Sequence, residues 1–157
     1  MNDQEYMARV RAMEGRLYRV AQAILWRDAD CADAIQEAVF RGWLKKGRLE
    51  EPKYFETWLI RILINQCRDM LRRRAREGLP LGPEPSREDR LCEDLQLRLA
   101  LKGLPEKYRL PLLLHHLEGY PIRDISKMLG IPEGRVTARL HQGRKALKDL
   151  LDGGETR

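Results

Sequence analysis

The chain has 157 residues, a length that suits either one ordinary domain or two small helical ones. Its 30 Lys and Arg residues exceed its 24 Asp and Glu residues, and the net charge of +6 favours a polyanionic partner such as nucleic acid or an anionic membrane surface. Three widely spaced cysteines without a CxxC pair argue against a zinc site or a disulfide framework, and no stretch approaches the ~20 apolar residues of a membrane span.

Amphipathic helices are predicted throughout the first half of the chain. Apolar residues recur at intervals of three and four over residues 10–25, which predicts a first helix there. A second helix follows the acidic, capping-type cluster at residues 27–30 and should end near Lys46; its inward side is marked by Ile35, Val39 and Trp43. A third covers residues 54–76 and carries its apolar residues on one side: Phe55, Trp58, Leu59, Ile62, Leu63, Cys67, Met70 and Leu71.

The composition changes sharply after residue 76. Residues 77–86 contain three prolines and two glycines, which neither a helix nor a strand tolerates well, so we expect a flexible linker over residues 77–94. Helical spacing resumes over residues 95–103 and again from Pro105 to about residue 117. Because strand-type alternation is absent from the sequence, we predict an all-α protein of two small helical domains joined by that linker.

A helix-turn-helix is predicted near the C-terminus. Pro121 suits the first turn of a helix, Gly130 supplies the left-handed backbone that ends it, and Pro132 precedes a second helix that begins near Glu133. Two helices joined by a few residues that include a glycine form this motif. The core stripe of the second helix should contain five residues: Val136, Leu140, Gly143, Leu147 and Leu150.

The opposite side of this last helix has the composition of a DNA-reading surface. At about 100° per residue, small and hydrogen-bonding side chains share one face and arginines flank it. The residues concerned are Gly134, Arg135, Thr137, Ala138, Arg139, His141, Gln142, Arg144 and Lys145. Gln and His can bond base edges while the arginines reach phosphates, so we favour DNA binding over a merely solvated basic face.

A second basic stripe lies along the third helix, on the side away from its apolar residues. It contains Thr57, Arg61, Asn65, Arg68 and Arg72. Near its start lie Lys53 and Tyr54, a basic and aromatic pair of the kind found in single-stranded nucleic-acid sites. Part of the positive charge at the end of this helix can instead be capping of the helix dipole. Trp58 fits either the core or a base-stacking role.

The second helix carries acidic groups on one face. Asp33 and Glu37 lie together with Gln36 beside them and Arg41 one turn on. This is either an ordinary solvated face or a docking surface for a basic protein partner. The neighbouring Phe40 and Leu44 either fill the core or add apolar anchor area to such a dock.

Three motifs, in order along the chain, resemble one family. They are "DAIQEAVFRGW" at residues 33–43, "YFETWLIRILINQCRDMLRRR" at residues 54–74 and "LPEKYRLPLLLHHLEGYPIRDISKMLGIPEGRVTARLHQGRKALKDLL" at residues 104–151. Together they are similar to the conserved helices of the extracytoplasmic-function (ECF) sigma factors, a group within the sigma-70 family. These are bacterial transcription initiation factors of two domains.

The resemblance implies a role for each domain. Residues 1–76 would be sigma region 2, which binds the β′ clamp helices of core RNA polymerase and recognises and melts the −10 element. Residues 95–157 would be region 4, which binds the −35 element and the β flap. The implied polymerase contacts are Asp33, Gln36, Glu37 and Arg41, and the implied −10 contacts are Lys53, Tyr54, Trp58, Arg61, Asn65, Arg68 and Arg72. The implied −35 contacts are Arg135, Thr137, Ala138, Arg139, His141, Gln142 and Arg144.

The resulting hypothesis is a cytoplasmic promoter-specificity subunit of a stress-response type, with an anti-sigma factor as a further expected partner. It is not an enzyme and needs no metal or cofactor, since the sequence has neither a phosphate-binding Gly loop nor a metal-ligand cluster, and its histidines have no obvious nucleophile partner. The alternative is a stand-alone helix-turn-helix regulator, which would bind duplex DNA by itself, usually as a symmetric dimer.

Overall fold

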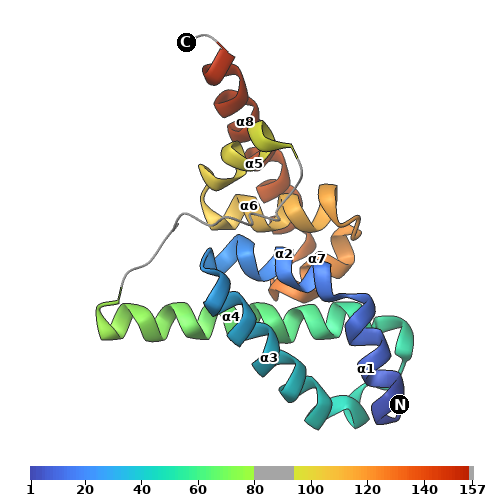
Figure 1. The fold of residues 1–157 in the computed structure, drawn as a ribbon. Coiled ribbons are helices and arrows are strands. Elements are labelled where there is room, and N and C mark those ends of the chain that lie inside the picture. Colours follow the sequence, from blue (N-terminus) through green and yellow to red (C-terminus); the bar gives the residue numbers. More distant parts are fainter. Residues whose placement is uncertain (80–93, 156–157) are drawn as a thin grey trace. The chain divides into compact units, whose positions relative to one another are not determined.

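A computed structural model describes residues 1–79 and 94–155 of the chain, with side chains to residue 153. The chain divides into two compact units, residues 1–87 and 88–157, and each is described by itself. All the regular elements in the described ranges are helical, which confirms the all-α prediction (Figure 1). Residues 80–93 of the predicted linker lie outside these ranges. Within them, no helix combines the length and the apolar character needed to cross a bilayer.

Unit 1 contains four α-helices and two short 3-10 turns among its described residues. They are α1 (Asp3–Ala12), α2 (Glu14–Leu25), α3 (Asp28–Lys45), η1 (Lys46–Arg48), η2 (Pro52–Tyr54) and α4 (Phe55–Glu77). The single first helix predicted over residues 10–25 is wrong, because the chain breaks at Met13 between α1 and α2. A one-residue break leaves the spacing of apolar residues almost unchanged, so the periodicity gave no sign of it.

The core of unit 1 forms around α4, against which both α2 and α3 pack. Because α4 is covered from two directions, its buried side is wider than a single stripe. Ile60 and Ile64, which the predicted apolar side omitted, are fully buried together with Leu59, Leu63 and Cys67. The C-terminal end of α4 is joined to the first turn of α3 by an ion pair of 2.6 Å between Arg74 and the largely buried Asp30.

A close helix approach occurs where α3 crosses α1 and α4. The buried Tyr6 of α1 donates a hydrogen bond of 2.6 Å from its hydroxyl to the carbonyl oxygen of Val39. Burial raises the pKa of Tyr6 to about 12. Gly42 lies about one turn after Val39 on the same side of α3. A Cβ at Gly42 would collide with the Tyr6 hydroxyl and lie 3.2 Å from Leu59. Gly42 is therefore required for this crossing.

Unit 2 begins with α5 (Leu95–Lys102), whose first turn is capped by the Asp94 side chain, which accepts the Leu97 N–H at 2.9 Å. It continues with four elements: α6 (Glu106–Leu112), the π-helical turn η3 (Leu113–Leu117), α7 (Ile122–Leu129) and α8 (Glu133–Glu155). Gly130 adopts φ +67 and ends α7, and the Ser126 hydroxyl donates to the Ile131 carbonyl at 2.6 Å. The predicted helix-turn-helix is confirmed in α7 and α8.

The core stripe of α8 is shorter than predicted. Val136, Leu140 and Gly143 are buried, Leu147 is half-buried and Leu150 is 44% exposed. Near the C-terminal end of α8, the Leu150 side chain lies beside Gly103, where a Cβ would be 3.4 Å from it, and much of its remaining surface is open to solvent. The prediction of Leu150 as a core residue is therefore wrong.

We predict that Gly42→Ala lowers the free energy of unfolding of unit 1 by about 1–3 kcal/mol, because the added methyl group displaces Tyr6 from its bond to Val39. Trp26, Trp43 and Trp58, the three tryptophans of the chain, all lie in unit 1, so urea unfolding followed by tryptophan fluorescence reports on this unit. The matched control is Gly47→Ala in η1, where a Cβ would meet nothing within 4 Å. Equal stabilities of the two variants would contradict the prediction.

Candidate nucleic-acid and protein-binding surfaces

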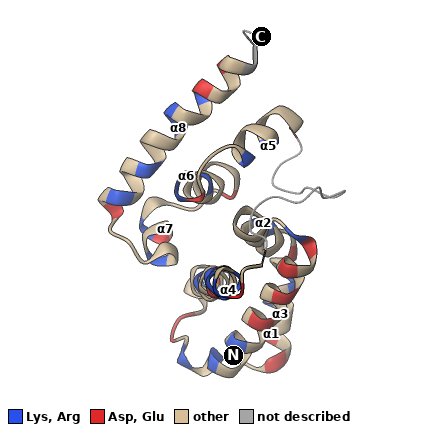
Figure 2. Cartoon of the chain, turned by 90° about the vertical axis from the view of Figure 1, so that its left-hand side faces the viewer, with Lys and Arg blue, Asp and Glu red and all other residues tan. Residues whose placement is uncertain are grey.

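The outward face of α8 carries the side chains that the sequence assigned to DNA. Val136, Leu140 and Gly143 turn inward, so the helical repeat leaves Thr137, Ala138, His141 and Gln142 exposed on the other side. Of the flanking arginines, Arg135 and Arg144 are exposed and Arg139 is half-buried. Figure 2 shows Lys and Arg positions recurring along α8. The face has the shape and the donors of a helix that reads a major groove.

Three hydrogen bonds fix polar groups on this face. The Tyr108 hydroxyl of α6 donates to Gln142 Oε1 at 3.2 Å, and Thr137 Oγ1 donates to the Glu133 carbonyl at 3.1 Å. Arg144 Nη1 donates to His116 Nε2 at 3.1 Å. The part that Tyr108 takes was not predicted, because residue spacing along one helix contains no information about which residue of another helix lies beneath it.

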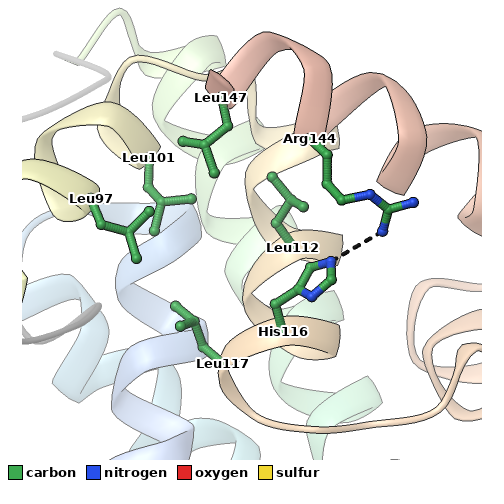
Figure 3. A pocket seen from close by; sticks show the side chains of 7 residues that line it. All are labelled: Leu97, Leu101, Leu112, His116, Leu117, Arg144 and Leu147. Atoms are coloured by element: carbon green, nitrogen blue, oxygen red, sulfur yellow. Dashed lines mark hydrogen bonds between the residues drawn. The ribbon is translucent and has the colours of Figure 1, made fainter. Parts of the chain in front are cut away.

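An apolar pocket of about 240 Å³ opens beside α8, next to Arg144 and Leu147. It is lined by Leu97, Leu101, Leu112, His116, Leu117, Arg144 and Leu147 (Figure 3). Five leucines form its walls, and the Arg144–His116 hydrogen bond lies at one side of it. This pocket was not predicted, because its lining comes from α5, α6, η3 and α8, and residue spacing within one helix does not show which side chains of different helices meet.

The hydrogen bond from Arg144 favours the neutral form of the His116 side chain. Arginine can only donate, so His116 Nε2 accepts the Arg144 bond and carries no proton. Burial, the neighbouring His115 ring at 4.9 Å and the Arg144 charge all lower the pKa of His116 below its ordinary value. His115 itself bonds the Tyr120 carbonyl through Nδ1 at 2.9 Å, which orients the pair.

The second basic stripe lies on the outer side of α4. Arg61, Asn65 and Arg72 are exposed, whereas Thr57 and Arg68 are half-buried. Arg72 forms an ion pair with Asp69, one turn back on the same helix. Lys53 and Tyr54 lie side by side at the start of the stripe, with the Lys53 ammonium 5.1 Å from the centre of the exposed Tyr54 ring.

Trp58 lies within unit 1 rather than on an open platform. Its side chain is half-buried, and its ring contacts Phe55 with centroids 5.9 Å apart. A Cβ at Gly42 would also lie 3.4 Å from the Trp58 ring. Trp58 thus packs between α3 and α4. Most of its side chain is buried in unit 1, as expected for a core role, and a smaller part is open to solvent.

The acidic face of α3 is exposed to solvent at Asp33 and Gln36. Glu37 is half-buried and its carboxylate pairs with the Arg41 guanidinium at 3.0 Å. Figure 2 shows Asp and Glu positions along α3 and α1. The four predicted polymerase contacts, which include Asp33 and Arg41, are therefore together on one helix and accessible.

A cluster of large apolar side chains lies next to this acidic face. Phe40 is 54% exposed and Leu44 is 61% exposed, so neither fills the core of unit 1. Trp43, predicted on the inward side of α3, is also exposed; its indole N–H donates to Asp3 at 2.9 Å and its ring stacks on Phe40. The inward assignment of Trp43 is wrong, because Ala34, Ala38 and Gly42 supply the buried side of α3.

Comparisons with known families and proteins agree with one another. The family described as "Sigma-70 region 2" matches residues 9–77, and "Sigma-70, region 4" matches residues 94–147. The chain is 35% identical over 156 residues to the ECF RNA polymerase sigma factor SigE of Mycolicibacterium smegmatis, covering 90% of this chain but only 60% of that protein. It is 31% identical to the ECF RNA polymerase sigma factor SigM of Mycobacterium tuberculosis, covering 87% of this chain and 71% of that protein.

Two solved structures of complexes have a similar fold. One is the sigma factor RpoE from Bartonella quintana in complex with the anti-sigma factor NepR, with a TM-score of 0.75, 22% identity and 95% coverage of each chain. Another is CnrH in complex with the cytosolic domain of CnrY, with a TM-score of 0.72, 23% identity and coverage of 97% of this chain and 90% of that one. At these identities the likeness concerns the fold.

We predict that His116 titrates below its ordinary pKa of 6.5 in the folded protein, and that Arg144→Met raises this pKa. Because the unfolded chain binds the proton more readily, the stability that neutral His116 contributes is present above the ordinary pKa and is lost as the pH falls through the folded one. Histidine NMR titration measures both effects. Lys148→Gln, which removes an exposed charge one turn further along α8, is the control and should change the pKa of His116 less.

Proposed function

The chain belongs to the extracytoplasmic-function RNA polymerase sigma factors, and from this membership we propose that it directs core RNA polymerase to promoters without catalysing a reaction itself. The observation that carries the proposal is the pairing of the two family matches with two separate sets of exposed groups, one on α3 and α4 and the other on α8. We assign −10 recognition to residues 1–76 and −35 recognition to residues 95–157.

The polymerase contact is proposed for the acidic face of α3. Asp33, Gln36, Glu37 and Arg41 would meet the β′ clamp helices, with charge complementarity steering the encounter. The exposed Phe40 and Leu44 beside them would supply apolar anchor area, since an exposed aromatic residue that becomes buried commonly contributes most to an interface. The proposal takes the docking alternative for Phe40 and Leu44, because both side chains are exposed.

Promoter contacts are proposed for both units. On unit 1, seven residues would meet the −10 element: Lys53, Tyr54, Trp58, Arg61, Asn65, Arg68 and Arg72. The exposed Tyr54 ring is suited to stacking on an unpaired base, worth about 1–3 kcal/mol. On unit 2, Arg135, Arg139 and Arg144 would contact phosphates of the −35 element, while Thr137, Ala138, His141 and Gln142 lie against base edges.

Two further protein contacts are proposed. The apolar pocket of unit 2 is lined entirely by residues of the region that matches sigma region 4, and its five leucines suit burial of an apolar segment of the β flap. An anti-sigma factor is also proposed as a partner, because RpoE of Bartonella quintana was solved with the anti-sigma factor NepR. The groups left exposed for polymerase are the ones such a protein would cover.

The stand-alone helix-turn-helix regulator is not favoured. It accounts for α7 and α8, but it gives no reason for the match of residues 9–77 to sigma region 2. Nor does it explain an acidic and apolar face on α3 in a chain of net charge +6.

Run-off transcription with bacterial core enzyme on a promoter library tests the proposal. The chain plus core enzyme is expected to give transcripts from a subset of promoters that share −10 and −35 sequences, while either component alone gives none. An electrophoretic shift with and without core enzyme separates the alternative: tight, specific duplex binding by the chain alone would overturn the proposal.

We predict that the double variant Asp33→Lys, Glu37→Lys weakens binding to core enzyme at least about tenfold, because it places like charge against a basic partner. The melting temperature should change little, since both residues lie at the surface of α3. The double variant Asp149→Lys, Asp152→Lys, at two exposed positions of α8, is the charge-matched control. Unchanged affinity in the double variant would remove α3 as the docking surface.

A further inference from the structure

The hydrogen bond between Tyr108 and Gln142 affects which base a side chain of α8 can contact. Gln142 is the last exposed residue before the buried Gly143, and its amide oxygen accepts the Tyr108 hydroxyl at 3.2 Å. Tyr108 lies in α6 and is half-buried, so its phenol ring is held by unit 2 while its hydroxyl reaches the DNA side of α8. The contact thus joins a residue outside the helix-turn-helix to a proposed base-contacting side chain.

Close packing of α6 on α8 creates this contact. A Cβ at Gly143 would lie 3.2 Å from both Tyr108 Cβ and Leu112 Cδ1, which is tighter than an ordinary van der Waals contact. Neighbouring residues of α6, Leu110 and Leu112, are buried, so this helix has little freedom to shift. The Lys107 ammonium lies over the Tyr108 ring, 5.0 Å from its centre, and adds a cation–π contact that helps to hold the ring.

The hydrogen bond fixes which end of the Gln142 amide is presented outward. A glutamine side chain has an acceptor oxygen and two N–H donors, and it pairs with adenine by using both ends at once. When the oxygen is bonded to Tyr108, turning both ends toward a base breaks that bond, so pairing with adenine loses the net stabilisation of one hydrogen bond. The donors remain available for bases whose major-groove edges offer acceptors without a donor beside them, namely guanine with N7 and O6 and thymine with O4; adenine places its N6 amino donor beside its single acceptor, N7.

We propose that Tyr108 is a positioning residue that makes Gln142 a donor-only reader, so that the −35 base it contacts is guanine or thymine in preference to adenine or cytosine. This inference rests on the proposed function of α8 and adds to it the polarity of one base contact. Tyr108 acts through Gln142 and touches no base itself.

The test is run-off transcription by the complete polymerase holoenzyme on a library randomised in the −35 element, with sequencing of the transcribed templates. The wild type should favour guanine or thymine at one position. Tyr108→Phe removes the hydroxyl and frees the amide oxygen, so adenine should gain at least about fivefold relative to guanine and thymine at that position alone. Gln142→Glu, which offers acceptors only, should shift the preference toward cytosine.

Two controls separate positioning from a structural effect. Tyr18→Phe makes the same chemical change in unit 1, where the hydroxyl bonds Asp28, and should leave the −35 base preference unchanged. In a Gln142→Ala background, Tyr108→Phe should cause no further change, because the two residues act as one pair.

The outcomes are distinct. A Tyr108→Phe variant that keeps the wild-type base preference, or that scales all promoters equally, would overturn the inference while the proposed function stands. A Gln142→Ala variant with the wild-type preference would overturn it as well, since Gln142 would then read nothing. Failure of the wild-type chain to support any transcription with core enzyme would instead reject the proposed function, and this inference with it.

Discussion

Close packing of helices at one buried glycine in each unit is the constraint on which the binding surfaces depend. At Gly42, α3 approaches α1 and α4 so closely that a methyl group on this residue would collide with the Tyr6 hydroxyl. At Gly143, α8 approaches α6 within contact of Tyr108 and Leu112. A helix buried on one side at such short range has a fixed rotation about its axis. The direction in which α3 presents Asp33, and α8 presents Gln142, follows from that rotation.

A second layer of side chains then restricts the polar groups on these faces. On α8, the amide of Gln142 and the guanidinium of Arg144 are bonded from α6 and η3, through Tyr108 and His116. On α3, Glu37 and Arg41 hold one another. Polar groups oriented before binding lose less side-chain entropy when a partner arrives. The apolar residues beside them, such as Phe40, remain exposed in the described structure and retain their area for association.

The sequence was sufficient where a structural feature is local. The helix-turn-helix followed from Gly130 and the flanking prolines, because left-handed backbone and a fixed φ are properties of single residues. It was insufficient where packing from several directions decides: Ile60 was missed because α4 is covered by two helices, and Trp43 was misplaced because small residues fill the inward side of α3. The Tyr108–Gln142 contact spans 34 residues, so no periodicity within one helix contains it.

Several arginines are paired within the chain itself, and this gives a physical reason for the chain to depend on a larger assembly. The net charge of +6 favours phosphate in general, yet Arg72 and Arg74 pair with Asp69 and Asp30, and Arg144 is bonded to His116. Each of these contacts competes with a phosphate and lowers the sequence-independent attraction on which non-specific DNA binding depends. Two DNA-binding faces that are individually weak become selective when both engage one promoter at once, because the second contact is then intramolecular. In the function proposed here, the polymerase bound at α3 supplies the fixed spacing that this gain requires.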